Sequence, residues 1–308
     1  VIDDQGYQRI LPQVPDYPLS CVDLRHASAD ERSGWEEETR EKLGHEVHDT
    51  AKWPLFTLHA AQLDDQRLRL CISLDNLICD GRSMVMLLSE WALLARSPHH
   101  QLPALEISFR DYVMSQPQWQ QQPAWQRALD YWLSRIDTLP PAPQLPVDDM
   151  ALTHVKPRFT RYQAQLAPAE WQQLRQYAAQ SGITPNALLL TAWGYVLANW
   201  SAERQFTLNL TQFQRPDVHA QMASLVGDFT SLSLLACDYR HPASFVQHAQ
   251  ALQQQLGSDL SHSDVSAVRV LREAARRFGR VDAMAMPVVF TSGLGVDNRG
   301  SDASVAAD

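Results

Sequence analysis

The chain has 308 residues, which allow one large or two ordinary domains at the usual size of about 100–200 residues per domain. Apolar residues make up 45% and charged residues 20%, which excludes an intrinsically disordered or collagen-like chain. The formal net charge of −9 argues against a nucleic-acid partner, because such binding needs clustered Lys and Arg. No apolar run is long enough to span a bilayer and the first residues resemble no signal peptide, so a soluble, cytoplasmic protein without a membrane partner is expected.

In the first half of the chain, the patterns predict the order helix, strand, turn, helix. Four residues recur at i+4 intervals in an otherwise acidic stretch, which indicates a helix; they are Trp35, Thr39, Leu43 and Val47. Apolar and polar residues alternate over 67–74, as in a strand with one buried face. A polar turn is expected at 75–83. Residues 84–95 are apolar nearly all round, which suits a helix enclosed by other elements.

A proline-rich segment interrupts the chain at 139–146, where four prolines stiffen an extended stretch that cannot continue a helix. We expect a boundary between two lobes just after it, with an N-terminal lobe at 1–150 and a C-terminal lobe at 151–308.

In the second half, helical stripes and short apolar runs alternate. Helices are expected at 171–178, at 184–200 and at 245–256, and Thr184 followed by Pro185 is typical of a helix start. Strands are expected at 206–210, 232–236 and 287–291. Mixed helices and strands in two halves indicate a two-lobed α/β or α+β protein.

The cysteines and histidines do not have the spacing of common metal or catalytic motifs. The four cysteines form no CxxC pair and lie mostly in apolar stretches, which predicts free buried thiols; they are Cys21, Cys71, Cys79 and Cys237. His45 and His48 lack the HExxH spacing of a zinc site, and an HxxxD at 26–30 is attributed to chance. The sequence has no GxSxG, P-loop or GxGxxG motif, which excludes the usual serine hydrolases, nucleotide hydrolases and dinucleotide enzymes.

The most informative stretch is the turn at 75–83, between a predicted strand and a predicted helix. Asp75 and Asp80 can orient a substrate there, share a proton or anchor an arginine. In the structural interpretation, Asp75 ends the strand, Asp80 pairs with an arginine and Ser83 caps the helix. Both interpretations stay open on these residues alone.

Three further segments follow this turn in order: 209–215 with amides and an arginine, 227–235 reading GDFTSLSLL, and 287–294 reading PVVFTSGL. Together with the turn they resemble the heterocyclization domains of nonribosomal peptide synthetases, of the siderophore type. The turn matches the family's DxxxxDxxS, residues 139–147 resemble its proline-rich LPxxPxLP, and the last two segments match GDFTxLxLL and PVVFTSxL. The resemblance covers essentially the whole chain.

The resemblance implies a fold and an activity. The fold is a V-shaped pseudo-dimer of two chloramphenicol-acetyltransferase-like α/β lobes with a tunnel between them, here incomplete at both ends. The enzyme would join a carrier-bound acyl thioester to the amine of a carrier-bound Cys, Ser or Thr as an amide, and then cyclodehydrate the product to a thiazoline or oxazoline. Implied partners are the upstream and downstream peptidyl carrier proteins, which bring substrates on 4′-phosphopantetheine, and the adenylation domain of the same synthetase. No directly bound cofactor and no metal is implied.

The resemblance also assigns the catalytic candidates. Thr291 is the implied catalytic hydroxyl, with Ser292 as the second candidate. The family pairs this threonine with an aspartate of a TPQVxLD motif that the chain does not contain. Asn209 is implied to line the tunnel and hold the amide oxygen of the intermediate, with a strand-end cap as its alternative role.

Other motif residues are expected to have more structural roles. Ordinary condensation domains carry HHxxxDG, and Asp75 and Asn76 replace its two histidines, so no imidazole base is expected at this turn. Asp80 is expected to be an ion-pair partner. Asp228 and Thr230 either contact the tunnel or stabilise their lobe.

Two questions stay open on the sequence. Four arginines share one side of a predicted helix, which is either solvated or meets an acidic carrier helix or a pantetheine phosphate; they are Arg272, Arg276, Arg277 and Arg280. The function is condensation with cyclodehydration, condensation alone, or a non-catalytic platform that docks carrier proteins. The patterns also leave open the identity of the acyl group and of the cyclizing residue.

Overall fold

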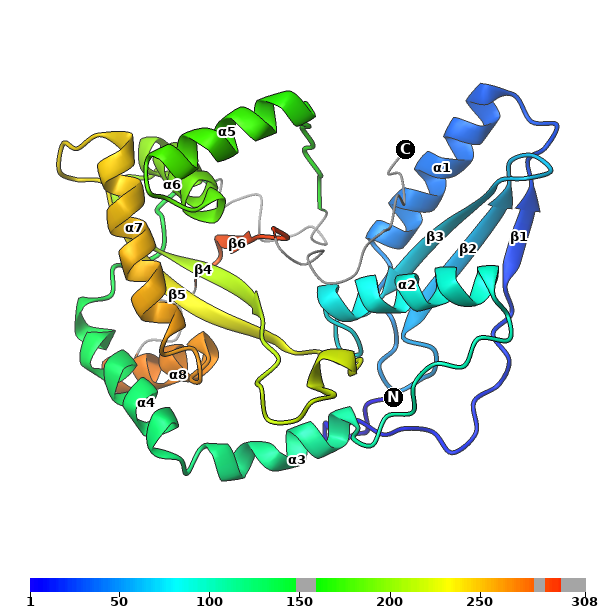
Figure 1. The fold of residues 1–308 in the computed structure, drawn as a ribbon, viewed down its shortest axis with the longest axis horizontal. Helices are drawn as coiled ribbons and strands as arrows, with labels where there is room; N and C mark the ends of the chain where they lie inside the picture. The colour runs from blue at the N-terminus through cyan, green and yellow to red at the C-terminus, as the bar shows by residue number, and fades with distance from the viewer. Residues whose placement is uncertain (148–158, 280–285, 295–308) are drawn as a thin grey trace. The chain divides into compact units, whose positions relative to one another are not determined.

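The computed structural model describes residues 1–147, 159–279 and 286–294, and they form two compact α/β units (Figure 1). The first unit contains residues 1–98, 159–163 and 226–228, and the second contains the rest. The predicted N-terminal lobe includes residues 99–150, whereas residues 99–147 group with the second unit by compactness. The division into two lobes at residue 150 stays a prediction. Within the described ranges, every helix is too short or too polar to cross a membrane.

A three-stranded sheet forms the centre of the first unit. Its strand order is β1-β2-β3: β1 (Ser20–Asp23) runs parallel to β2 (Phe56–Gln62), and β2 runs antiparallel to β3 (Leu68–Leu74). The alternation at 67–74 therefore predicts β3 correctly. α1 (Ala29–Gly44) packs against β3 and begins at Ser28, whose side chain accepts a hydrogen bond from the Glu31 backbone.

α2 (Gly81–Arg96) follows the turn after β3. The prediction that this helix is enclosed is wrong for the described residues, because Met84, Leu88 and Trp91 are 39–40% exposed. In α2, Ser83 is buried and residues 81–82, 86–87, 90, 92 and 94 are half-buried. The helix therefore has one covered side and one apolar side that remains accessible.

The sheet of the second unit has the strand order β5-β4-β6. β4 (Gln205–Phe213) lies in the centre, antiparallel to β5 (Thr230–Asp238) and parallel to the short β6 (Val289–Thr291). The three strands predicted in this half are confirmed, and β4 and β5 extend beyond the apolar runs.

Helices cover both faces of this second sheet (Figure 1). α6 (Pro185–Trp200) and α7 (Phe245–Leu260) pack on one face, and α4 (Pro123–Arg135) and α8 (Ala267–Phe278) on the other. α5 (Pro168–Gln180) packs beside α6. α3 (Phe109–Trp119) packs against the ring of Phe229.

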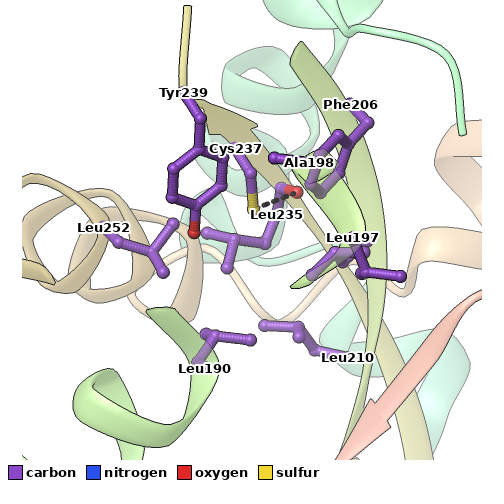
Figure 2. Packing of buried hydrophobic residues seen from close by; sticks show 10 residues of the cluster. Leu190, Leu197, Ala198, Phe206, Leu210, Leu235, Cys237, Tyr239 and Leu252 are labelled. Atoms are coloured by element: carbon purple, nitrogen blue, oxygen red, sulfur yellow. Dashed lines mark hydrogen bonds between the residues drawn. The ribbon is translucent and has the colours of Figure 1, made fainter. Parts of the chain in front are cut away.

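Figure 2 shows the core between the sheet and the α6 and α7 helices. It contains side chains from both helices, from β4, from β5 and from Tyr239; the labelled residues are Leu190, Leu197, Ala198, Phe206, Leu210, Leu235, Cys237, Tyr239 and Leu252. Because side chains alternate along a strand, Leu234 lies on the opposite face of β5, among residues of α4 and α8. The sheet is thus the middle of three layers.

The proline-rich segment lies beside β4 where the short β6 does not reach. The Thr207 amide donates to the Pro141 carbonyl at 2.8 Å, and the Thr207 hydroxyl donates to the Pro140 carbonyl at 2.6 Å. Prolines have no amide hydrogen, so this segment serves β4 through its carbonyl groups. The proline-rich segment therefore lies along the edge of β4 and accepts its hydrogen bonds there.

The four cysteines are free in the structure. Cys79 and Cys237 are buried as predicted, and burial raises the pKa of the Cys237 thiol to about 12. Cys21 is exposed, so the prediction of a buried thiol is wrong there. The reason is that all four residues of β1, the edge strand that carries Cys21, are exposed.

Gly194 is the position in α6 where a side chain has no room. A Cβ built there would overlap the hydroxyl oxygen of Tyr239 and lie 2.7 Å from its Cζ. We expect Gly194→Ala to lower the free energy of unfolding by about 1–3 kcal/mol, because Tyr239 is buried and cannot move freely. Gly257→Ala on α7, where a Cβ meets nothing within 4 Å, is the control and should be neutral or slightly stabilising. Urea unfolding of both variants measures the difference, and equal midpoints would contradict the steric argument.

Candidate functional site

The turn at 75–83 is organised by its two carboxylates. Asp75 follows β3 directly, and its Oδ1 accepts a hydrogen bond from the Leu77 amide at 2.9 Å. Asp80 is 1% exposed, and its Oδ1 accepts from the Ser83 amide at 2.7 Å. Asp80 is thus the N-cap of α2. The expectation that Ser83 caps the helix is wrong, because Ser83 is already in the first helical turn.

Ser83 joins this turn to the GDFT motif. Its hydroxyl lies 3.0 Å from the Gly227 carbonyl oxygen and 3.2 Å from the Gly227 amide nitrogen, so it donates to the former and accepts from the latter. The Asp80 amide donates to the same carbonyl at 3.0 Å. Two motifs separated by 144 residues are therefore joined by a buried hydrogen-bond network. In this network the side chains of Asp80 and Ser83 form hydrogen bonds with backbone groups.

An imidazole from outside the motif lies beside this turn. His48 Nδ1 lies 3.8 Å from Asp75 Oδ2, and His48 Nε2 lies 3.1 Å from Thr57 Oγ1. The ring comes from the loop between α1 and β2, outside the motif, which is why the motif alone did not indicate it. The His48 side chain is 10% exposed, so its ring packs within the first unit as a neighbour of Asp75.

Polar side chains gather in the second unit where β4 pairs with β6. The strand register places Thr211 opposite Thr291 and Asn209 opposite Val289. The Thr291 and Thr211 hydroxyl oxygens are 2.9 Å apart, within hydrogen-bond distance. Because side chains alternate along a strand, Asn209 and Thr211 project from the same face of β4. An amide and two hydroxyls thus lie close together on one face.

Asn209 lies inside β4 and is 8% exposed. The alternative of a strand-end cap is wrong, because β4 continues for four residues to Phe213. Its Oδ1 is buried and has no hydrogen-bond partner among the described residues. An unpaired buried acceptor is costly, and an N–H group of a bound molecule would satisfy it.

Ser292 is held by α6. Its hydroxyl lies 2.5 Å from Asn186 Oδ1, and it also accepts from the Leu294 amide at 3.3 Å. Asn186 is in the first turn of α6, so this contact ties the end of β6 to that helix. Thr291 is exposed, whereas Ser292 is half-buried. Thr291 is therefore the more accessible residue of the two candidates.

An apolar pocket of about 570 Å³ opens beside Thr291 between α6 and β6. It is lined by Leu189, Ala192, Trp193, Val196, Val289, Phe290 and Thr291. Thr291 is the only hydroxyl-bearing residue of this lining and belongs also to the polar cluster on β4 and β6. An apolar group bound in the pocket would therefore lie next to Thr291.

The two remaining candidates from the sequence, Asp228 and Thr230, belong to different units. Asp228 is half-buried and belongs to the first unit with Asp75, Asp80 and Ser83. Thr230 is exposed at the start of β5 in the second unit, the unit that also contains Asn209, Thr291 and Ser292.

The arginine face of α8 is partly neutralised by the chain itself. Arg276 contacts Glu273 at 3.0 Å, and Arg277 contacts Asp137 at 2.6 Å. Arg272 is exposed, and Arg280 lies outside the described residues. Docking of an acidic partner on this helix stays a prediction. Over the described ranges, no group of three or more His, Cys, Asp or Glu side chains could hold a metal ion.

The fold is that of solved nonribosomal peptide synthetase structures. The cyclization-docking bidomain of EpoB from Sorangium cellulosum matches with a TM-score of 0.82 and 36% identity, over 96% of this chain and 59% of that chain. Pyochelin synthetase PchF of Pseudomonas aeruginosa (strain UCBPP-PA14) is 40% identical over 96% of this chain and 16% of its own length. Phenyloxazoline synthase MbtB of Mycobacterium tuberculosis (strain ATCC 25618 / H37Rv) is 36% identical over 94% of this chain and 20% of its own length.

These similarities confirm the mixed α/β fold and the resemblance inferred from the motifs. The class is that of the domains that condense or cyclize substrates in nonribosomal peptide synthetases. The condensation domain family model matches residues 2–286, and the chain belongs to this family. It spans 16–20% of the length of the two curated relatives.

Proposed function

We propose that this chain is a heterocyclization domain of a nonribosomal peptide synthetase. It joins an acyl group to the amine of a carrier-bound cysteine, serine or threonine and then closes a thiazoline or oxazoline ring. The observation that carries this proposal is the cluster on β4 and β6, where Thr291 meets Thr211 and Asn209 has an unpaired acceptor. The match to the EpoB cyclization domain over 96% of the chain supports the same function.

In the first step, the amine attacks the carbonyl carbon of the upstream thioester. The C–N bond forms, the C–S bond breaks, and the carrier thiol leaves with the proton lost by the amine. Neither histidine of HHxxxDG is present, and the nearby His48 ring is largely buried. Amide formation would therefore depend mainly on placing the amine beside an already activated thioester.

In the second step, the side-chain thiol or hydroxyl attacks the amide carbonyl carbon. The resulting tetrahedral centre loses its hydroxyl group together with the nitrogen-bound proton, so one water leaves and a C=N bond forms. The Thr291 hydroxyl would donate a hydrogen bond to the departing oxygen. Asn209 Oδ1 would accept the N–H of the intermediate, which fits its unpaired state. The proposed partners are the two carrier proteins with their phosphopantetheine arms and the adenylation domain of the same synthetase.

The test is intact mass spectrometry of the downstream carrier in the natural polypeptide that contains this chain. The carrier is loaded with cysteine and incubated with an acyl-loaded upstream carrier. We expect acyl transfer with loss of one water. A downstream carrier loaded with S-methylcysteine is the control and should gain the acyl group without losing water, since its sulfur cannot close the ring.

Other outcomes distinguish the alternatives. Acyl transfer to cysteine without loss of water would reduce the domain to a condensation catalyst. No transfer, with carrier binding shown separately, would support a docking platform and contradict catalysis.

A further inference from the structure

Thr211 is a hydrogen-bond partner of the Thr291 side chain. The two residues are paired across β4 and β6, and their hydroxyl oxygens are 2.9 Å apart. Thr211 is half-buried in the central strand, whereas Thr291 is exposed at the end of the edge strand. Thr211, the less exposed member of the pair, is therefore the better fixed of the two.

Two further contacts hold the chain on either side of Thr291. The backbone N–H of Asn209 in β4 donates a hydrogen bond to the Val288 carbonyl, just before β6, at 3.0 Å. Ser292 is tied to Asn186 of α6 at 2.5 Å. With the chain held on both sides of Thr291, the remaining freedom lies in the Thr291 side-chain rotamer. A threonine has staggered χ1 rotamers, and a hydrogen bond from its hydroxyl favours one of them.

We propose that Thr211 is a positioning residue that orients the Thr291 hydroxyl for ring formation. This inference rests on the function proposed above and adds a residue that acts through Thr291. A hydroxyl is both donor and acceptor, so Thr211 can donate to the Thr291 oxygen while Thr291 donates to the departing oxygen of the tetrahedral centre. No net proton transfer between the two threonines is needed, because the leaving water takes its second proton from the ring nitrogen.

The prediction separates a hydroxyl effect from a packing effect. Thr211→Val keeps the size and β-branching of the side chain but removes the hydroxyl. We expect about a tenfold slower ring closure, which is the rate effect of one lost hydrogen bond, with amide formation at the wild-type rate. Thr211→Ser keeps the hydroxyl and should close the ring within about twofold of wild type.

The control is Thr207→Val on the same strand. Thr207 lies on the same face of β4, and its hydroxyl contacts the Pro140 carbonyl instead of Thr291. Its loss should change stability and leave the ratio of cyclic to linear product unchanged. The measurement is single-turnover mass spectrometry of linear and cyclic product on the downstream carrier, with the natural polypeptide that contains this chain.

The outcomes separate this inference from the proposed function. Wild-type ring closure by Thr211→Val, with closure lost in Thr291→Val, would overturn the role of Thr211 and leave the proposed function intact. Equal loss in Thr211→Ser and Thr211→Val, or loss of amide formation together with ring closure, would show a packing role and also overturn it. Absence of ring closure in the wild type would instead contradict the proposed function.

Discussion

Replacing Thr291 by valine should leave the linear amide on the downstream carrier and slow ring closure by about 100-fold. The magnitude is that expected when a hydrogen-bond donor to a developing charge is removed from an active site. Valine has nearly the same shape and suits a strand, so β6 and its pairing with β4 should persist. Mass spectrometry of the loaded carrier distinguishes the two products, which differ by one water.

Ser292→Ala is the comparison variant for this prediction. Ser292 is engaged with Asn186 and half-buried, so its replacement should affect ring closure much less than the loss of Thr291. Thr291→Ser should retain most of the cyclic product because it keeps the hydroxyl. If Ser292→Ala accumulates linear amide while Thr291→Val still cyclizes, the catalytic hydroxyl is that of Ser292.

Regular patterns made part of the fold predictable from the sequence. Period-two alternation indicated β3, and Thr184 followed by Pro185 indicated the start of α6, where the Thr184 hydroxyl accepts from the Ala187 amide at 3.1 Å. β1 and β2 were missed. β1 has four exposed residues, and β2 contains the half-buried and small residues of FTLHAAQ, so neither strand alternates strongly.

Two helices were missed for different local reasons. α3 contains Pro117 in its interior, a residue that normally ends a helix. α4 begins at Pro123, directly after a glutamine-rich stretch that has no apolar periodicity. In both cases the packing of the folded unit outweighs a weak local signal.

The sequence indicated which residues form the candidate site, but it did not indicate which of them contact one another. The motifs indicated Thr291 and Asn209, but the partner of Thr291 is set by the register of β4 and β6, which joins residues 80 positions apart. One signal could have found Thr211: it stands two residues after Asn209 in a predicted strand and must project from the same face. The contact between Ser83 and Gly227 had no such signal, because nothing local pairs the two motifs.

A buried carboxylate joins α4 to α7 in the second unit. Asp259 is 0% exposed, and its Oδ1 accepts from the Tyr131 hydroxyl at 2.7 Å and from Gln255 Nε2 at 2.9 Å. Arg135 of α4 forms an ion pair with the same oxygen. The Tyr131 ring stacks on His262 with centroids 3.8 Å apart. The network thus connects residues of two helices that are distant in the sequence.

Asp259→Ala should therefore lower the free energy of unfolding by about 3–5 kcal/mol, the usual cost of removing one member of a buried ion pair. Arg135, Tyr131 and Gln255 would each lose their acceptor. Asp259→Asn keeps an oxygen acceptor at nearly the same size and should cost much less. Urea unfolding followed by circular dichroism at pH 7 measures both, and a cost below about 1 kcal/mol for the alanine variant would show that the network contributes little.

Comparing the wild type with Asp259→Asn at different pH values tests the charge on Asp259. Burial raises the pKa of the Asp259 carboxyl above its ordinary 3.8, in spite of its three donors. The folded state then holds the proton more tightly than the unfolded state, so this group's contribution to stability falls as the pH rises through the raised pKa. Lowering the pH from 7 toward 4 should accordingly stabilise the wild type relative to Asp259→Asn, which does not titrate. An unchanged difference over this range would mean that the carboxylate stays ionised in the core, held by Arg135 against the cost of desolvation.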